Sequence, residues 1–454
     1  MPSWNGRGKP PPQGARLRAG TAAQLAIEPQ LNVFGSAPAA VQAPGMTSAT
    51  GHPPARPVRP GTDRRSGGLP RLFWVLWSGI LINRLGTLVE PFLGIYLVAV
   101  RGFPVTAAGG VLAIYALGSI VSQMLGGLLA DTLGRRPTLA LGMLANAASL
   151  LTLGYLTAAP AVTAAAFAAG ATIDIYRPAA QALVADVIPA AGRARAYGLI
   201  SWAANLGFSV AMLSGGMLAQ AGFRWLFWAD AVTCVAFAAL AWRAMPGTRP
   251  RPRARSKEPG GFGDVLRDRV MAAFGLVALG YMTVYQQAFT TLPIAMHERG
   301  LPPRAYGLVM ALNGIVIVTI QPLAGRWLAG RDPSLVVVAG NVLTAAGFAA
   351  TALASTVLGY AGAVCVWTLG EIAMAAAGAA IVAGLAPARL RGRYLGLYGA
   401  ASALGALLAP LAGTQLLRLG APALWLTCGA LAAAAALGQT ALAPAIRNKT
   451  SSLP

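Results

Sequence analysis

The chain has 454 residues, of which 56% are hydrophobic and only 11% are charged. Soluble domains carry about 25% charged residues, so this composition predicts an integral membrane protein and excludes an ordinary soluble fold. The formal net charge of +22 would suggest a nucleic-acid partner for a soluble protein, but the positions of the charges argue against one, as described below.

Residues 1–70 are rich in Pro, Gly, Ala and Arg, and they contain no apolar run that could cross a membrane. Chains of this composition bury too little apolar surface to fold. No apolar core follows a basic start, as a signal peptide would require. We therefore expect a disordered basic tail before the first membrane helix.

From Leu72 onward the chain divides into apolar stretches of about 18–25 residues, the length that crosses ~30 Å of hydrocarbon as a helix. Helix is expected because a backbone in lipid must satisfy its own hydrogen bonds. The predicted fold class is all-α, with twelve transmembrane helices. The predicted spans are 72–99, 107–130, 138–157, 161–184, 196–218, 223–243, 270–296, 304–328, 335–354, 357–385, 395–417 and 421–443.

The sequence also repeats itself at an offset of 198 residues. "RGFPVTAAGGVL" (Arg101–Leu112) aligns with "RGLPPRAYGLVM" (Arg299–Met310), and "IPAAGRARAYGL" (Ile188–Leu199) aligns with "APARLRGRYLGL" (Ala386–Leu397). Two stretches that share one offset predict two pseudo-repeated six-helix bundles around a central cavity. The predicted domains are the tail 1–70, the N-terminal bundle 71–243, a basic linker 244–265, the C-terminal bundle 266–445 and a tail 446–454.

The basic residues orient the predicted bundle. Of the 35 Lys and Arg residues, 28 fall in the two tails and in the loops on the same side of the membrane. The other loops carry only Arg101, Arg224, Arg299, Arg304 and Arg418. By the positive-inside rule both termini are cytoplasmic, in a multi-pass protein of the plasma membrane. This distribution explains the net charge without nucleic acid.

Residues for covalent, metal or nucleotide chemistry are not grouped in the sequence. Cys234, Cys365 and Cys428 lie inside apolar runs, and His52 and His297 are far apart. These positions predict neither a disulfide framework nor a zinc site. The chain lacks a GxxxxGK[ST] nucleotide-binding loop. We therefore expect no enzyme, no metal and no cofactor.

The loop between the second and third spans reads "GGLLADTLGRRPTL" (Gly126–Leu139). With twelve spans and the repeat, it resembles the G-x-L-A-D-x-x-G-R-R signature of the major facilitator superfamily, over about residues 70–445. The resemblance implies a gating loop whose acidic residue pairs with basic residues and with a helix start in the other half. Thr132 departs from the usual basic residue after the aspartate, which predicts a thinner charge network. The residues assigned to this gating loop are Gly127, Asp131, Gly134, Arg135 and Arg136, with a tight turn expected at Gly134.

The fifth span carries "GFSVAMLSGG" (Gly207–Gly216), which partly resembles the G-x-x-x-G-P-x-x-G-G motif of the drug:proton antiporter branch of that family. Ala211 and Met212 replace the motif's Gly-Pro pair. Close helix packing by small residues is the alternative interpretation of these glycines. The segment therefore supports antiport weakly.

Five charged residues are predicted at mid-membrane depth, in spans that the repeat relates and that line the central cavity in this superfamily. They are Arg84 and Glu90 in the first span, Asp174 and Arg177 in the fourth, and Glu371 in the tenth. Charges in lipid are costly and typically mark proton relays or substrate sites. Structural ion pairs are the other interpretation, since Asp174 and Arg177 are three residues apart and can pair on one helix face. We expect cross-helix pairs between Arg84 and Asp174 and between Arg177 and Glu90, with a bend at Pro91 beside Glu90.

Polar and aromatic side chains extend this candidate site. Gln286 and Gln287 belong to it in the seventh span, and Trp367 lies four residues before Glu371, where its ring would face a cationic substrate. Tyr281 and Tyr285 offer rings as well, although packing is the commoner role for such residues. Asp230 in the sixth span is interpreted as structural, near Arg224.

Together these patterns predict a secondary active transporter, a proton-coupled exporter of small amphipathic compounds that works by alternating access. The alternatives are a facilitator or importer of a sugar, amino acid or organic anion, and a non-transporting membrane sensor on the same fold. The expected partners are a small-molecule substrate, protons and membrane lipid, with a monomeric chain. The substrate's identity, the direction of transport and the coupling ion stay open at this level.

Overall fold

The structure, a computed structural model, describes residues 69–247, 265, 267–328, 330–387 and 390–452. Every regular element in these ranges is helical. Most of the predicted N-terminal tail (residues 1–68) and of the predicted linker (248–264) lies outside the described residues. The described chain therefore corresponds to the two predicted bundles and what directly adjoins them.

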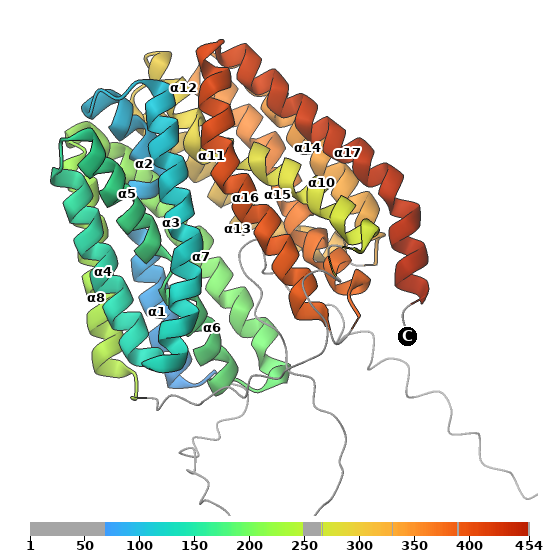
Figure 1. Cartoon of the computed structure of the whole chain (residues 1–454), viewed down its shortest axis with the longest axis horizontal. Coiled ribbons are helices and arrows are strands. Elements are labelled where there is room, and N and C mark those ends of the chain that lie inside the picture. The colour runs from blue at the N-terminus through green and yellow to red at the C-terminus, as the bar shows by residue number, and fades with distance from the viewer. Residues whose placement is uncertain (1–68, 248–264, 266, 329, 388–389, 453–454) are drawn as a thin grey trace, which may run out of the picture.

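The helices form two groups that follow each other along the chain and stand side by side (Figure 1). The N-terminal bundle contains α1 (Arg71–Leu85), α2 (Val89–Ile95) with the π-helix η1 (Tyr96–Val100), α3 (Val105–Thr132), α4 (Arg135–Tyr155), α5 (Ala159–Ile173), α6 (Tyr176–Val187), α7 (Ala190–Ala221) and α8 (Arg224–Ala244). The C-terminal bundle contains α10 (Arg269–Tyr285), α11 (Gln287–Thr290), α12 (Leu292–Glu298), α13 (Pro303–Leu328), α14 (Pro333–Thr351), α15 (Val357–Leu385), α16 (Arg391–Arg418) and α17 (Ala421–Ser452).

Eleven helical segments in the described chain are long and apolar enough to cross a membrane, counting α1 to η1 and α5–α6 as one segment each. The predicted seventh span, 270–296, corresponds to α10, α11 and α12, which are separated at Gln286 and Thr291. The all-α, two-bundle membrane fold expected from the sequence is therefore confirmed. α17 runs to Ser452, beyond residue 445, where the sequence analysis ended the bundle.

Three predicted spans are interrupted where their polar residues lie. The first breaks between Leu85 and Val89, the fourth at Asp174, and the seventh at Gln286. The bend expected at Pro91 is thus a full break just before it. Pro91 has no N–H to donate to the carbonyl of Thr87, so the helical ladder cannot run through this segment unbroken.

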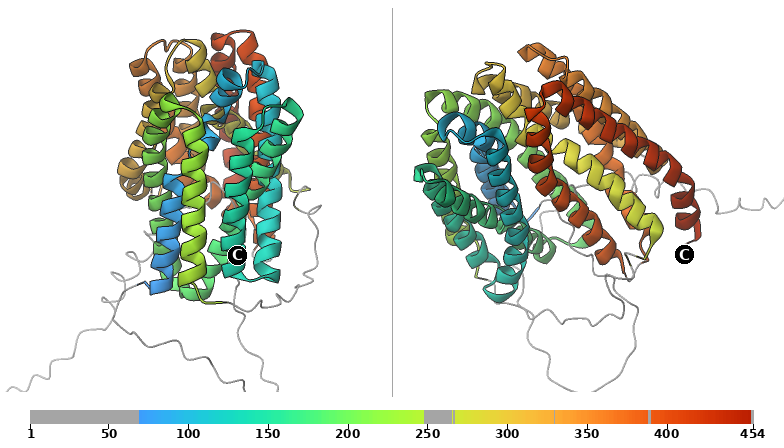
Figure 2. Two further views of the ribbon diagram at one scale, coloured as in Figure 1. Left: turned by 90° about the vertical axis from the view of Figure 1, so that its left-hand side faces the viewer. Right: turned by 45° about the horizontal axis from the view of Figure 1, so that its top comes forward.

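We call the end of the bundles that carries Arg71, Arg135 and Lys449 the basic end. The two bundles lie close together away from this end, around α2, α11 and α12, and draw apart toward it (Figures 1 and 2). The contact is tight enough to require glycine: a Cβ on Gly307 of α13 would lie 2.3 Å from the Met212 carbonyl oxygen of α7. Such close backbone approach through small residues is typical of packed membrane helices.

The apolar core is continuous across this contact. The Phe92 ring of α2 meets the Tyr306 ring of α13 edge to face, with centroids 5.3 Å apart, and each side chain is 1% exposed. A second buried cluster, which includes Phe73, Met143 and Phe237, lies within the N-terminal bundle alone. The bundles are thus joined by ordinary dense packing at one end.

Candidate functional site

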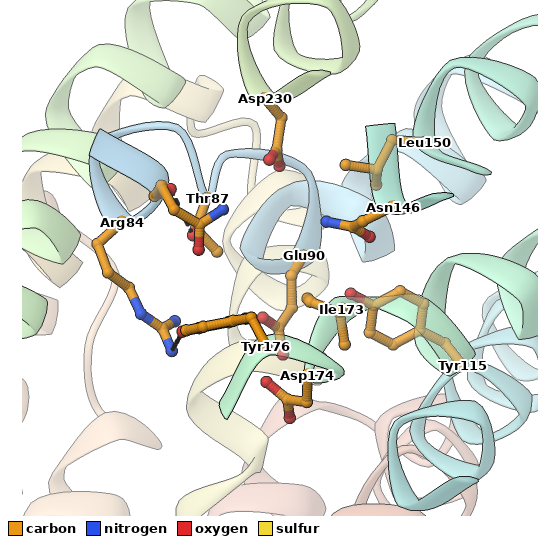
Figure 3. A pocket seen from close by; sticks show the side chains of 11 residues that line it. Arg84, Thr87, Glu90, Tyr115, Asn146, Leu150, Ile173, Asp174, Tyr176 and Asp230 are labelled. Atoms are coloured by element: carbon orange, nitrogen blue, oxygen red, sulfur yellow. Dashed lines mark hydrogen bonds between the residues drawn. The ribbon is translucent and has the colours of Figure 1, made fainter. Parts of the chain in front are cut away.

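A small polar cavity lies inside the N-terminal bundle, where the broken helices α1–α2 and α5–α6 meet (Figure 3). Its volume is about 10 Å³, room for about one water molecule. Arg84, Glu90 and Asp174 all line it, as the sequence predicted for a shared site. A cavity of this size suits a proton carrier or a water molecule and excludes a drug-sized ligand.

The charges in this cavity pair differently from the prediction. Arg177 Nε lies 2.5 Å from Asp174 Oδ1, an ion pair between residues three apart across the break. Arg84 Nη2 donates instead to the Tyr176 hydroxyl, at 2.9 Å (Figure 3). The predicted cross-helix pairs are therefore wrong, because Asp174 is already paired with Arg177 three residues later, a spacing at which side chains on one helix face meet. Tyr176 is a partner that the sequence analysis missed.

Glu90 forms no ion pair with a basic side chain of the described residues. It is solvent-exposed although Val89 and Pro91 on either side are buried, and its side chain points toward Asp174 in Figure 3. Around it, the buried Arg84 Nε and Tyr115 Oη form no hydrogen bond. Buried polar atoms in this state are uncommon in native structures and are a frequent feature of functional sites.

Asp230, interpreted from the sequence as a structural residue near Arg224, belongs to this cavity. Its Oδ2 accepts hydrogen bonds from the main-chain N–H groups of Leu88, at 3.1 Å, and Val89, at 3.2 Å. These are donors that a helix start leaves without intrahelical acceptors. The side chain is 4% exposed. Asp230 therefore caps the second half of the broken first span and fixes the turn that carries Glu90.

The other predicted membrane carboxylate, Glu371 of α15, lies in the C-terminal bundle and is held by neutral donors. The Tyr285 hydroxyl donates to its Oε1 and Asn313 Nδ2 to its Oε2, both at 2.8 Å. No basic residue of the described chain forms an ion pair with it. Asn313, one turn from the middle of a predicted span, was missed because a lone amide in an apolar helix gives little signal.

Two residues expected to face the substrate lie instead in the packing of the C-terminal bundle. Trp367 is 1% exposed and stacks on Phe348, with ring centroids 5.6 Å apart. Gln287 is 2% exposed and its Nε2 donates to the Ala409 carbonyl at 2.9 Å. Gln286, at the helix break, is partly exposed. Of these three residues, Gln286 alone has the access that a substrate contact needs.

In the predicted gating loop, Arg135 forms two ion pairs with described residues of the N-terminal bundle. Arg135 lies 3.5 Å from Asp131 and 3.4 Å from Asp186 at the end of α6. Arg136 stacks over the Trp242 ring at 4.5 Å. Gly134 has a φ of +91°, which confirms the tight turn expected there. A Cβ on Gly127, the remaining predicted member, would meet nothing within 4 Å.

Comparison with known proteins agrees with this architecture. The family model for the Major Facilitator Superfamily matches residues 76–372 and 287–452. The chain belongs to the major facilitator superfamily. Its members in this comparison are membrane transporters, so the chain is a multi-pass membrane transporter that handles small molecules.

The relatives are distant in sequence. An uncharacterized MFS-type transporter, YttB of Bacillus subtilis, is 27% identical over 353 residues, covering 76% of this chain and 88% of its own. The multidrug resistance protein MdtH of Edwardsiella ictaluri is 27% identical over 348 residues, covering 75% and 84%. MdtH of Cronobacter sakazakii is 26% identical over 328 residues, covering 71% and 81%.

Solved structures share the fold at lower identity. A mutant of the peptide transporter POT in complex with alafosfalin superposes with a TM-score of 0.70 at 16% identity, covering 84% of this chain and 96% of its own. A mutant of the nucleoside transporter NupG gives 0.64 at 14% identity, covering 83% and 99%. At these identities the likeness supports the fold of the transporter and says nothing of its substrate.

Proposed function

We propose that this transporter is a proton-coupled exporter of small amphipathic compounds and works by alternating access. The observation that carries the proposal is a membrane carboxylate on each side of the bundle interface, Glu90 and Glu371, neither with a basic ion-pair partner among the described residues. An ionised carboxylate in this setting is costly unless a proton or a cationic group neutralises it. A proton and a cationic substrate would compete for the same carboxylate, and this competition couples export of the substrate to entry of the proton.

The arrangement of the bundles supports alternating access. If the basic end is cytoplasmic, as the positive-inside rule predicts, the bundles are joined on the outer side and apart on the inner side. The gating loop is then expected to lie away from the C-terminal bundle, which agrees with the space around Gly127 and with the two ion pairs that Arg135 forms with described residues of its own bundle. Closing the inner side would bring this loop to the C-terminal bundle.

The direction of transport draws support from the relatives named multidrug resistance protein, which match about three quarters of the chain. The test is efflux by inverted membrane vesicles, with fluorescent amphipathic cations as probes and an imposed proton gradient. Glu371→Gln keeps both hydrogen-bonded positions but cannot exchange a proton, so we expect proton-driven efflux to be lost while insertion is unchanged. Glu298→Gln, an exposed acid at the far end of α12, is the matched control. Undiminished efflux by Glu371→Gln would remove that residue from coupling.

One observation favours a different cargo, an organic anion. Arg84 has a buried Nε without an acceptor and a second nitrogen on the Tyr176 hydroxyl, a guanidinium that could bind a carboxylate. Arg84→Gln should then abolish uptake or export of organic anions and spare amphipathic cations. A sensor without transport would give no substrate-dependent proton flux in either assay.

A further inference from the structure

A groove at the basic end of the N-terminal bundle brings two arginines together. It lies between the first turn of α1 and the last turn of α8 and has a volume of about 430 Å³. Arg71 and Arg243 lie on its walls, both exposed, with Leu72, Val75 and Pro246 beside them. The groove thus combines two cationic side chains with an apolar lining.

Neither arginine has an anionic partner within the described chain. Arg71 and Arg243 form no ion pair or hydrogen bond there. The residue before α1 is Pro70, which offers no side-chain cap. Two like charges on one groove repel each other, so the site favours an anion that comes from elsewhere.

The internal repeat shows how the same position is satisfied in the other bundle. The offset of 198 places Arg71 on Arg269 and Pro70 on Asp268. Asp268 caps α10 and also binds Lys449 from the end of α17, so a carboxylate of the chain itself joins the first helix to the last. In the N-terminal bundle proline replaces that carboxylate, whereas the second arginine is unique to it, because Ala441 stands at the repeat position of Arg243.

The surroundings of the groove identify the source of the anion. Trp74 and Trp242, 44% and 51% exposed, flank it on α1 and α8, and exposed tryptophans at helix ends are typical of the membrane interface. The groove therefore lies at headgroup depth, and Leu72 and Val75 in its lining offer apolar surface to an acyl chain. Basic pockets between membrane helices at this depth bind anionic lipid headgroups.

We propose that the groove between α1 and α8 binds an anionic phospholipid, with Arg71 and Arg243 on its phosphate and Leu72 and Val75 along its acyl chain. The lipid supplies the negative charge that Asp268 supplies in the C-terminal bundle, and so ties the first helix of the N-terminal bundle to the last. This site is separate from the polar cavity and does not depend on the substrate or direction of transport.

The test uses the full chain purified in a neutral detergent and follows thermal unfolding during titration with phosphatidylglycerol or phosphatidylcholine. A ligand that binds only the native state raises the unfolding temperature in proportion to its affinity. We expect phosphatidylglycerol to stabilise the wild type more than phosphatidylcholine. The double variant R71Q/R243Q should bind phosphatidylglycerol roughly thirtyfold more weakly, and R71K/R243K should keep most of the effect.

The matched control is R267Q/R269Q, which removes two exposed arginines from the start of α10. It should retain the preference of the wild type for phosphatidylglycerol. An equal loss in this control would show a general charge effect and overturn the proposal. So would a wild type without lipid preference, or equal stabilisation by glycerol phosphate, which has no acyl chain and would mark a site for free phosphate.

Discussion

The cap that Asp230 provides can be tested by removing its oxygen acceptor. Asp230→Ala leaves the main-chain N–H groups of Leu88 and Val89 without the hydrogen bonds that they now make at 3.1 and 3.2 Å. Leu88 and Val89 are each 2% exposed, so bulk water does not reach these two donors. We expect the segment that carries Glu90 to lose its fixed position.

The size of the effect follows from these two bonds. The Leu88 N–H also donates to the Gly86 carbonyl at 2.7 Å, so Asp230→Ala leaves only the Val89 N–H without an acceptor. A buried donor in that state costs about 1–3 kcal/mol, so the alanine variant should lose ~1–3 kcal/mol of stability. In Asp230→Asn one amide oxygen can stand where Oδ2 now accepts both bonds. It loses only the contribution of the charge, since charge-assisted bonds are roughly twice as strong as neutral ones. The asparagine variant should therefore lose less than half as much.

Thermal unfolding in detergent measures the stability, and hydrogen exchange of the peptide that spans Leu88 measures the local cap. Asp186→Ala, which removes a half-exposed carboxylate from α6 of the same bundle, is the control and should cost about 0–1 kcal/mol. The reasoning is refuted if Asp230→Ala matches the wild type in both measurements. Equal damage by the alanine and asparagine variants would show that the negative charge matters and the acceptor does not.

The orientation of the bundles, the contact between them and the ion pair of Asp268 can each be tested by substitution. Glu90→Cys should react with a membrane-impermeant thiol reagent added at the basic end, and Glu298→Cys only with reagent from the other side; the reverse pattern would contradict the orientation. Gly307→Ala should cost about 1–3 kcal/mol of stability by overpacking the bundle contact, and normal thermal unfolding would show that the contact yields freely. Burial raises the pKa of Asp268, but the bond from Lys449 helps to lower it below its ordinary value of 3.8 overall. The Asp268 carboxylate therefore contributes its full stabilisation at pH values above 3.8, and that contribution is lost as the pH falls through the lowered pKa. Asp268→Asn should remove this loss and flatten the acid side of a profile of stability against pH.

The spans and the repeat could be predicted because hydrocarbon thickness and chain periodicity act on whole segments. The gating turn at Gly134 was predicted as well, since its motif specifies the backbone. Pro91 predicted a bend in the first span. The breaks in the fourth and seventh spans were not predicted, because the average hydropathy of a segment is nearly unaffected by a change in direction at Asp174 or Gln286.

The pairing of charges was predicted only in part. The i,i+3 spacing allowed a pair between Asp174 and Arg177 on one helix face, and the structure has that pair. The partner of Arg84 is the Tyr176 hydroxyl, which the sequence does not reveal because a tyrosine in an apolar helix is more often a packing residue. The sequence placed Asp230 near Arg224. Nothing in its own segment reveals that its carboxylate accepts main-chain hydrogen bonds from a turn about 140 residues earlier in the chain.

The break before Pro91 also affects the main chain at the wall of the polar cavity. Thr87 lines the cavity, and its carbonyl receives no main-chain N–H from position 91 because proline has none. Proline at position 91 thus removes one helical hydrogen bond from the wall of the cavity through the main chain, and no substitution of a lining side chain can restore that bond.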